Sequence, residues 1–473
     1  MEYIMKATNI KTDVAVLGGG LAGCSAALAA ARNGARVTLI EATGVLGGQA
    51  GIGIVTPFGA YCTDKTGKSF GGIVEELFCD IKTLGEKYCS GNDDGIHDSL
   101  ASAHIVKYLL VKKLSEAGVK IRFHSTFAGC TVRDGRIESI KVLEKSGFCD
   151  IFADVFIDAS GDGDLLVEAG ADYVTGSEPG VFEDLSATGL GKRHFSDSEY
   201  GGYDKNGVMQ PVSIFFVMGG VDYERAAELN NKHLKFGDYG ITREKFEAWQ
   251  FAGTDGFEIT DDSIPTPQGR VLVSRAPRSD MAVVNMSRIT GIDGSDTDSL
   301  NEGEVRAQLQ LIAVVDFLKT FIPGFENSYL VGSGSSLGVR ETRRLRGLYI
   351  LSGLEAINCQ RSDEAIARGS YIIDIHDPNG RAAAIGGSLK GDFYDIPYGC
   401  LTSKELENLL VCGRCISVDH VAHSSTRIQG TCVMTGQAAG TAAAMCGGRI
   451  KDVKEINVGA LREKLISDGV YLD

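Results

Sequence analysis

The sequence has little that would suit a membrane, a metal cluster or a nucleic acid. No apolar run reaches the roughly 18–20 residues that a membrane-spanning helix needs. The N-terminal MEYIMKATNIK lacks the apolar middle region of a signal peptide, and the 12 cysteines are too scattered for a disulfide framework, so we expect a cytoplasmic protein. The C-x-x-C pair Cys412 and Cys415 has no second pair nearby, so we predict no metal site or iron–sulfur cluster. The net charge of −15 argues against a nucleic-acid partner, which would need a basic surface.

Glycine, by contrast, is abundant, with 61 residues against 9 prolines, which suggests tight turns and close contacts between backbone and ligand. In VLGGGLAGCSAA, Gly18, Gly20 and Gly23 have the spacing G-x-G-x-x-G. The first glycine makes a tight turn, the second lets a pyrophosphate approach, and the third lets a helix pack on a strand. An apolar strand (13–17) precedes this turn and an Ala-rich helix (about 21–33) follows it, so we predict a dinucleotide at the helix N-terminus.

The residue that follows the second predicted strand (36–41) narrows the choice of dinucleotide. Glu41 would accept hydrogen bonds from a ribose diol and repel a 2′-phosphate, which favours FAD or NAD over NADP. The glycine-rich VLGGQAG (45–51), the strand DVFIDAS with its GDGD continuation, and a C-terminal strand–turn–helix (409–445) favour FAD. The last of these would bring a helix N-terminus to the flavin pyrimidine ring. The alternative is a glycine turn that packs helix on strand without a ligand.

The order of elements predicts an α/β fold with a discontinuous Rossmann-like FAD-binding domain. We expect a helix over 102–117, a strand at VKIRFH and a hairpin around Arg133-Asp134-Gly135. The middle of the chain mixes strand-like pieces with helices, of which VRAQLQLIAVVDFLKTF is the clearest. We therefore predict that residues 1–180 and 395–473 form the FAD-binding domain and that 181–394 form an inserted mixed α+β substrate domain.

Several motifs in order make a family resemblance specific. They include GGGLAG with Glu41, LGGQA, FIDASGDGDL, GVRETRRLRG, YIIDIHDP, IPYGCL and NLLVCGRCISVDHVAHSSTRIQGTCVMTGQAAG. The chain resembles FAD-dependent oxidoreductases of the glutathione-reductase-like superfamily, and more narrowly a large bacterial family described only as FAD-dependent oxidoreductases. The resemblance covers nearly the whole chain, but it implies no particular substrate.

The resemblance implies a set of cofactor contacts. The pyrophosphate would lie against Gly18 to Gly23, including Leu21 and Ala22, and the adenosine ribose against Glu41, with Ala42 beside it. Gly47, Gly48 and Gln49 would lie along the cofactor, and Ala128 would face the adenine. Ala159, Gly161 and Asp162 would lie near the adenosine half. Gln429, Gly430 and Thr431 would approach the isoalloxazine. Related flavoproteins often carry an acidic residue after the glycine of the last strand; here Arg414 follows Gly413, which leaves the ribityl contacts open.

Candidate catalytic residues precede the last helix and lie in an arginine-rich stretch. His420, His423 and Arg427 suit proton transfer and charge stabilisation beside a flavin, although the histidines would serve equally well as partners of backbone groups. Arg340 and Arg343, together with Arg344, Arg346 and the intervening Glu341, would grip a carboxylate or phosphate. The alternative for this stretch is an ion-paired element between domains. His376 and Tyr398 are further candidates that we expect to be structural.

Two expectations concern the source of electrons. A redox disulfide between Cys412 and Cys415 is disfavoured because both lie in a predicted buried strand and turn. Cys62 is a single thiol in the loop after the first β-α-β unit, where glutathione-reductase relatives with a redox disulfide carry two cysteines. VGSGSSLG (331–338) lacks the spacing, helix and acid of a second nucleotide motif, so we expect a plain loop and no NAD(P)H domain.

The leading functional interpretation is an oxidoreductase that uses FAD to act on an unidentified small organic substrate by hydride transfer to or from flavin N5. The alternatives are an electron-transfer subunit that relays electrons to a protein partner, and a protein that holds FAD without redox chemistry. An external electron donor or acceptor is compatible with the first interpretation.

Overall fold

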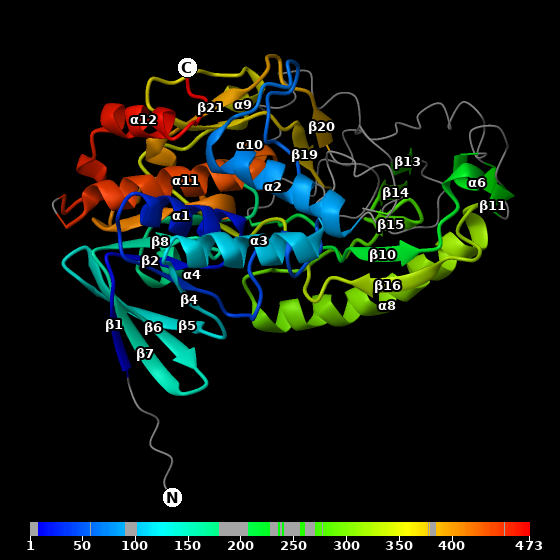
Figure 1. Cartoon of the computed structure of the whole chain (residues 1–473), viewed down its shortest axis with the longest axis horizontal. Coiled ribbons are helices and arrows are strands. Elements are labelled where there is room, and N and C mark those ends of the chain that lie inside the picture. Colours follow the sequence, from blue (N-terminus) through cyan, green and yellow to red (C-terminus); the bar gives the residue numbers. More distant parts are fainter. Residues whose placement is uncertain are drawn as a thin grey trace, which may run out of the picture.

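The fold is described from a computed structural model. It describes residues 8–56, 58–89, 102–178, 207–227, 235–236, 239–240, 256–260, 270–276, 278–376, 378, 385–448 and 450–473. Figure 1 shows two regions, a layered region that holds both ends of the described chain and a second region built around one long helix. No helix of the described residues is long and apolar enough to cross a membrane.

A parallel five-stranded sheet forms the centre of the layered region, in the order β22-β8-β2-β3-β4. Its strands are β2 (Val14–Leu17), β3 (Val37–Ile40), β4 (Lys120–Arg122), β8 (Val155–Asp158) and β22 (Leu409–Val411). Four of them are short apolar runs whose residues are all buried, which is typical of parallel strands covered on both faces. Because β22 pairs with β8, the C-terminal part of the chain completes a sheet that the N-terminal part begins.

Helices cover this sheet, and two of them pack unusually closely (Figure 1). They are α1 (Leu21–Arg32), α2 (Gly72–Tyr88), α3 (Ala103–Glu116), α11 (Gln429–Cys446) and α12 (Val458–Ser467). A Cβ atom on Gly436 or Gly440 of α11 would lie 2.2 or 2.0 Å from the carbonyl oxygen of Ala22 or Ala26 in α1. Only glycine permits this approach, and it brings the start of α11 beside the glycine turn. The predicted helices at 21–33 and 102–117 are confirmed, and the first is followed by the left-handed Gly34, with φ of 88°.

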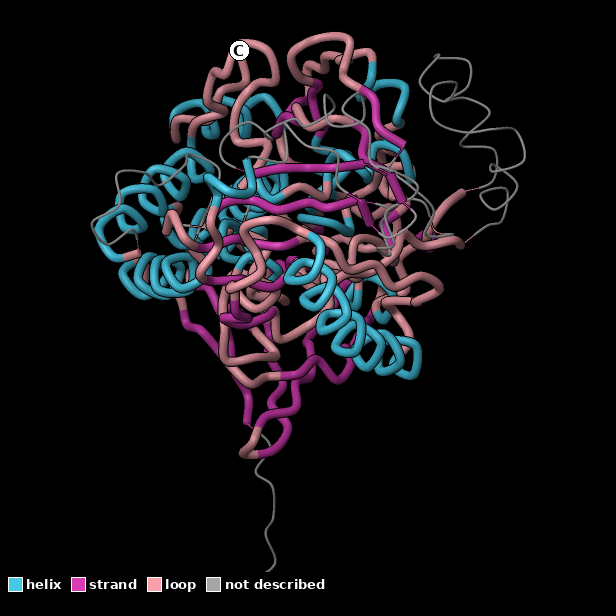
Figure 2. The backbone as a smooth tube through the Cα atoms, turned by 90° about the vertical axis from the view of Figure 1, so that its right-hand side faces the viewer, coloured by secondary structure: helices cyan, strands magenta, loops and turns pink. Residues whose placement is uncertain are grey.

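A mixed layer, antiparallel except for β1, which runs parallel to β7, projects from the same region, as the strands at the lower end of Figure 2 show. It contains β1 (Thr8–Lys11), β7 (Gly147–Phe152), β6 (Arg136–Glu144) and β5 (Thr126–Arg133), in that order. The predicted hairpin is confirmed, since β5 and β6 are joined by Asp134 and Gly135, both with positive φ.

The second region has its own sheet and apolar core. Its sheet, in the order β13-β14-β15-β10-β16, comprises β13 (Gly256–Thr260), β14 (Arg270–Arg275), β15 (Met281–Val284), β10 (Phe216–Gly219) and β16 (Tyr329–Ser333). Helix α8 (Thr297–Phe321) contributes Leu311, Val314 and Leu318 to a core shared with Phe216 and Val284. The helix begins before the predicted VRAQ stretch because Asp296 caps it, its side chain accepting from Ser299 N at 2.8 Å. The expectation of a plain loop at 331–338 was wrong for its first residues, which belong to β16.

Further short elements complete the fold. The strand pairs are β17 (Arg343–Leu345) with β9 (Tyr173–Thr175), β18 (Ala365–Gly369) with β21 (Tyr394–Pro397), β19 (Ile373–Ile375) with β20 (Ile385–Gly387), and β11 (Lys235–Phe236) with β12 (Tyr239–Gly240). The short helices are α4 (Asp164–Glu168), α6 (Tyr223–Ala227), α9 (Gly353–Ile357) and α10 (His420–Thr426). The sequence did not predict α10, which carries both candidate histidines.

Candidate functional site

The glycine turn after β2 is tightly packed on one side and open at its second glycine. Gly18 has φ of 106°, and a Cβ there would lie 2.4 Å from Ala159 O. A Cβ on Gly23 would lie 1.9 Å from Gly18 O. At Gly20, no described heavy atom lies within 4 Å of the position that a Cβ would take. A backbone held rigidly with one bare, open face at a helix N-terminus is what a pyrophosphate site requires.

Glu41 and the following loop lie against this turn. Glu41 Oε2 accepts from Gly19 N at 2.8 Å, and Oε1 accepts from Thr43 N at 2.7 Å. Gly47 N donates to Gly19 O at 2.8 Å, and a Cβ on Gly48 would lie 3.0 Å from Gly20 Cα. The structure therefore brings Glu41, the adjoining Ala42, Gly47 and Gly48 together with the glycine turn.

The loop after β8 and the turn after β22 form the other side of the site. Asp162 Oδ1 accepts from Thr342 Oγ1 at 2.7 Å and from Arg414 Nη2 at 3.0 Å. A Cβ on Gly161 would lie 2.7 Å from the same Nη2, and Gly413, with φ of 80°, lies against Ala22. The Arg414 that replaces the usual acid is thus paired with Asp162, which comes from a segment 252 residues earlier.

Ala128 lies on the exposed face of β5, apart from the turn. Its strand begins beside the loop that follows Glu41, because Ser125 N donates to Glu41 O at 3.0 Å. The adenine contact of Ala128 stays a prediction.

Several buried polar atoms near these segments have no hydrogen-bond partner among the described residues. They are Gln49 Oε1, Thr56 Oγ1, Asn285 Oδ1, Arg414 Nη1, both ring nitrogens of His423, Arg427 Nε, Gln429 Oε1 and Thr431 Oγ1. An unsatisfied buried polar group costs about 1–3 kcal/mol, so native proteins rarely leave one without a partner. Four of these residues, Gln49, Arg414, Gln429 and Thr431, are ones predicted to contact FAD. The residues present therefore fit a polar dinucleotide that would satisfy them.

The histidines of α10 meet a buried carboxylate. His420 Nδ1 lies 2.7 Å from Glu341 Oε1, which also accepts from Arg344 Nη1 at 2.5 Å, while Gln210 Nε2 donates to Oε2 at 3.2 Å. Glu341, Arg344 and His420 are all buried. Sequence reasoning placed these histidines directly before the last helix, whereas in the structure they belong to a helix of their own, capped by Asp419.

Electrostatics define the proton positions in this cluster. Burial raises the pKa of Glu341, but His420 and Arg344 outweigh it and hold that pKa well below its usual range. Since an ionised carboxylate only accepts hydrogen bonds, His420 donates to Glu341 from Nδ1. Burial also lowers the pKa of His423 well below its usual value, so this imidazole is neutral.

A chain of contacts extends from Glu341 to Arg427 and closes on α10. Gln210 Oε1 accepts from His376 N at 3.0 Å, His376 Nε2 lies 3.4 Å from Asp374 Oδ2, and Arg427 Nη2 donates to Asp374 O at 3.0 Å. His423 Nδ1 lies 3.9 Å from Glu341 Oε1. We call this set the polar ring: Glu341, Gln210, His376, Asp374, Arg427 and His423. Burial and the charge of Arg340 lower the pKa of His376 to about 3.

The arginine stretch proves largely ion-paired, as the alternative interpretation held. Arg343 donates to Asp164 Oδ1 at 2.5 Å and to Asp162 O at 2.8 Å, and Arg344 contacts Glu341 and Glu178. Arg340 Nη1 donates to Pro211 O at 2.5 Å. Arg346 is exposed. These contacts explain why so many arginines gather in one short stretch of the sequence.

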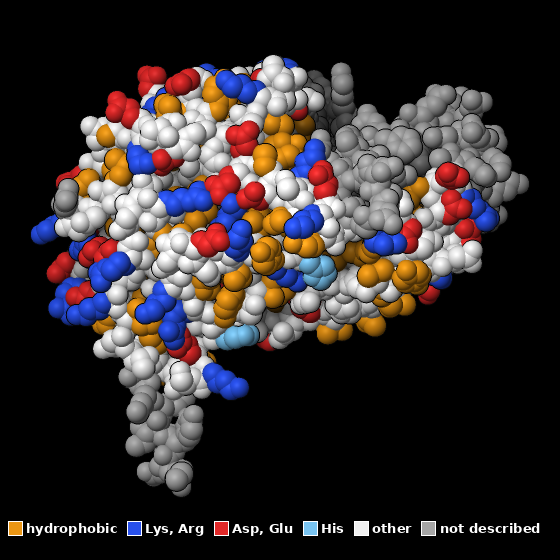
Figure 3. Space-filling view, viewed as in Figure 1, with side chains coloured by type: hydrophobic (Ala, Val, Ile, Leu, Met, Phe, Trp, Pro, Cys, Tyr) orange, Lys and Arg blue, Asp and Glu red, His pale blue; other side chains and the backbone are white. Residues whose placement is uncertain are grey.

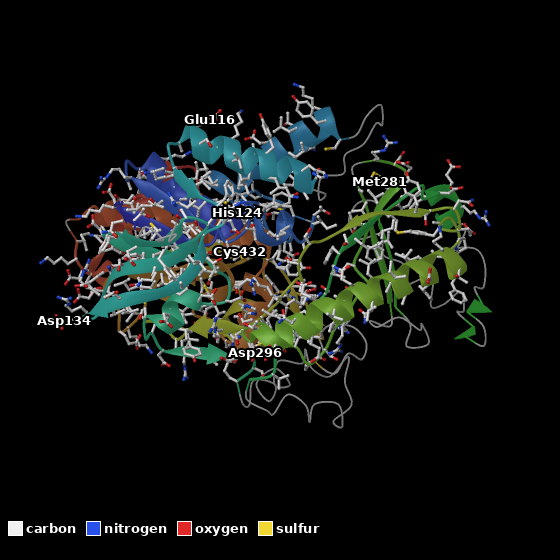
Figure 4. All side chains as sticks on the ribbon, turned by 90° about the horizontal axis from the view of Figure 1, so that it is seen from below. Glu116, His124, Asp134, Met281, Asp296 and Cys432 are labelled. Atoms are coloured by element: carbon white, nitrogen blue, oxygen red, sulfur yellow. The ribbon has the colours of Figure 1, made fainter. Side chains whose placement is uncertain are left out.

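The remaining candidates have structural surroundings. Tyr398 Oη donates to Val453 O at 2.8 Å. Cys412 and Cys415 are buried free thiols, and burial raises the pKa of each well above its usual value. Cys62 is a half-buried free thiol. Figure 4 places Cys432, at the start of α11, well inside the molecule, whereas Asp134 and Glu116 lie at its edges.

Three residues of the site were not singled out by sequence reasoning. Gln210 and Asp374 belong to the polar ring, and Arg288 Nη2 lies 3.1 Å from His376 Nδ1. Asp374 had one signal, its position two residues before His376 in YIIDIHDP. Arg288 lies in NMSRITGIDGSD (285–296), a further stretch that carries the family resemblance, whereas Gln210 belongs to no recognisable motif.

The fold and the glycine-lined site define an enzyme that binds a flavin dinucleotide. A family model described as "FAD dependent oxidoreductase" matches residues 13–465, and the chain belongs to this family. It is therefore an FAD-dependent oxidoreductase with FAD as its cofactor. No curated protein matches the sequence.

Solved structures with distant similarity include flavin enzymes of several kinds. The geranylgeranyl bacteriochlorophyll reductase-like protein of Thermoplasma acidophilum is 13% identical, with a TM-score of 0.43 over 97% of this chain and 84% of that one. The flavin-dependent brominase Bmp2 is 11% identical, with a TM-score of 0.44 over 97% and 83%. The p-nitrophenol 4-monooxygenase PnpA of Pseudomonas putida DLL-E4 is 12% identical, with a TM-score of 0.42 over 97% and 84%.

Proposed function

We propose that this oxidoreductase exchanges a hydride between a small organic substrate and N5 of FAD, and that His420 moves the accompanying proton. FAD supplies the two-electron chemistry when bound, so the protein must hold the cofactor, orient the substrate and manage the proton. The observation that carries the proposal is the set of buried polar atoms that have no partner among the described residues, which extends from Gln49 through Arg414 to Thr431.

The proposed cofactor contacts follow the geometry of the turn. Gly18 to Gly23, with Leu21 and Ala22, would hold the pyrophosphate, and Glu41 would hold the ribose. The Asp162–Arg414 pair would leave Arg414 Nη1 for the cofactor, because Nη2 is engaged by Asp162. Gln429, Gly430 and Thr431 at the start of α11 would lie beside the isoalloxazine.

The proposed proton path depends on Glu341. Its carboxylate orients the His420 ring through a 2.7 Å contact to Nδ1. Arg344, which has no exposed surface, keeps the carboxylate ionised. His423 stays neutral and Arg340 adds positive charge near the polar ring, while Arg343 secures Asp162 and Asp164.

We also propose that residues 1–180 and 395–473 form the FAD-binding domain and that residues 181–394 form an inserted substrate domain. We further propose that the protein is a member of the glutathione-reductase-like superfamily. The pairing of β22 with β8 and the separate apolar core of α8 and its sheet support the division. The glycine turn followed by Glu41 supports the superfamily.

An anaerobic screen tests the function. Purified yellow protein is mixed with individual metabolites, and bleaching of the oxidised flavin absorption is followed; reoxidation of dithionite-reduced protein is screened in parallel. We expect at least one small molecule to change the flavin redox state. Protein that stays colourless after incubation with FAD would refute the cofactor site, and flavin that responds only to a protein donor would favour the electron-transfer alternative.

A matched pair of variants tests the proton path. His420→Gln should retain FAD but slow bleaching by the active metabolite about 10²–10⁴-fold, the usual contribution of a positioned acid–base group. His104→Gln changes an exposed histidine of α3 and should leave the rate unchanged. Equal rates in both variants would remove His420 from the mechanism.

A further inference from the structure

Arg427 presents a buried donor that no described residue accepts from. Its side chain is 10% exposed, and Nη2 is engaged by Asp374 O at 3.0 Å. Nε is buried and has no partner among the described residues. A guanidinium is charged at all relevant pH values and offers its N–H groups in a planar fork, so a buried N–H of this kind calls for an acceptor, best of all an anion.

Neighbouring groups on the same elements also lack partners. His423 lies one turn before Arg427, since Arg427 N donates to His423 O at 3.0 Å. Neither ring nitrogen of His423 has a hydrogen-bond partner in the described structure. Thr431 Oγ1, in the first turn of α11, is likewise buried without one. The unused donors and acceptors thus cluster where α10 passes into α11.

An apolar surface adjoins this cluster. Ile54 and Val55 pack with Phe215, Val283 and Ala276 between the two regions of the molecule. Gln429 Nε2 donates to Val55 O at 2.7 Å, which ties this apolar cluster to the start of α11. A ligand that reached Arg427 would therefore meet a charged end and an apolar side.

We propose that Arg427 binds a carboxylate group of the substrate, so that the substrate class of this oxidoreductase is an organic acid with an apolar body. This inference rests on the proposed function. A planar carboxylate matches the guanidinium fork, and His423 or Thr431 would supply a second hydrogen bond to it. Arg340 and Arg427 both place a positive charge near His376, and after burial these charges contribute to the lowering of its pKa.

The charges already present favour a carboxylate over a phosphate. Asp374 Oδ2 lies 3.4 Å from Arg427 Nη2, and Glu341 occupies the opposite side of the polar ring. A dianionic phosphate would add a second negative charge beside these carboxylates, whereas a monoanion completes the coordination of Arg427 with less repulsion.

The test compares charged and neutral probes of the same shape on FAD-loaded protein. Acetate and acetamide differ in charge but hardly in size. We expect acetate to perturb the oxidised flavin spectrum saturably, with a dissociation constant of about 1–10 mM, because so few atoms can supply only a weak affinity. Acetamide should bind at least about tenfold more weakly. Acetate near saturation should also raise Tm by about 1–3 °C. Equal responses to acetate and acetamide, or a response to inorganic phosphate alone, would overturn the proposal.

Variants locate the effect. Arg427→Gln should weaken acetate binding at least about tenfold, and Arg427→Lys should retain part of it, because the charge remains while the planar fork is lost. Arg361→Gln, at a half-exposed arginine paired with Asp395, is the matched control and should bind acetate normally. Retained affinity in Arg427→Gln would overturn the assignment, and if that variant does not fold, the acetate and acetamide comparison on unmodified protein still decides it. Colourless protein refutes the proposed function, whereas yellow protein that reacts only with neutral metabolites refutes this inference alone.

Discussion

A single methyl group at Gly20 should separate cofactor binding from folding. Gly20 has φ of −66° and ψ of 177°, values that alanine adopts without strain, and no described heavy atom would lie within 4 Å of the added Cβ. Alanine at such a position gains about 0.4–1 kcal/mol from a less flexible unfolded chain and loses about 0.5–1 kcal/mol because it is a poorer N-cap than glycine. The stability of cofactor-free Gly20→Ala should therefore stay within about 1 kcal/mol of the unmodified protein.

The same methyl group should obstruct the pyrophosphate. It would occupy the open face at the helix N-terminus and displace the phosphates from backbone N–H groups, each charge-assisted hydrogen bond being worth about 1.5–3 kcal/mol. Loss of one or two such bonds, about 3 kcal/mol in total, corresponds to an FAD dissociation constant about 100-fold higher.

Two measurements on one preparation check this prediction. Urea unfolding of cofactor-free protein gives the stability, and quenching of flavin fluorescence during titration gives the FAD dissociation constant. Gly18→Ala is the contrasting variant, because its Cβ would lie 2.4 Å from Ala159 O at a φ of 106°, so it should destabilise the fold itself. If Gly20→Ala bound FAD as tightly as the unmodified protein, the pyrophosphate would not lie at this turn.

Two further predictions concern packing and pH. Gly440→Ala should lower the free energy of unfolding by about 1–3 kcal/mol, because its Cβ would lie 2.0 Å from Ala26 O. The control in thermal unfolding is Gly459→Ala, whose Cβ would lie 3.2 Å from its nearest neighbour, Asn457 Oδ1. Equal Tm values for the two variants would contradict the close contact between the helices. His376, with its pKa lowered to about 3, binds a proton in the unfolded chain but not in the folded protein as pH falls from about 6.5 to 3, so folding stability falls across this window. The free energy of unfolding, measured with urea, should fall between pH 7 and pH 5 by about 2 kcal/mol less in His376→Gln than in the unmodified protein. Identical decreases in the two proteins would show that His376 is not buried in its neutral form.

The molecular surface offers less guidance to function than the interior. Acidic and basic side chains are interspersed over the face that carries α2 and α3, and hydrophobic side chains gather over α8 and β16 (Figure 3). The exposed hydrophobic residues of these two elements are Val305, Leu309, Ile312 and Phe321 of α8 and Tyr329, Leu330 and Val331 of β16. The buried polar atoms, by contrast, come from the segments that the sequence motifs had indicated.

Local patterns predicted much of the cofactor side of the site. The spacing of Gly18, Gly20 and Gly23 required a strand before the turn and a helix after it, and Glu41 then followed at the end of the next strand. These features depend on backbone sterics and on neighbours within a few dozen residues, which a sequence displays directly. The hairpin at Asp134 and Gly135 was predictable for the same reason.

The polar ring could not be predicted, because its contacts join distant segments. Glu341 meets His420 across 79 residues and Gln210 across 131, while Asp162 meets Arg414 across 252. No periodicity records such pairs, since they form only after α11 packs on α1 and β22 joins the parallel sheet. The sequence by itself determined that a dinucleotide has a place to bind. Only the tertiary structure decided which carboxylate orients which histidine, because burial changes the energy of a charge far more than its chain neighbours do.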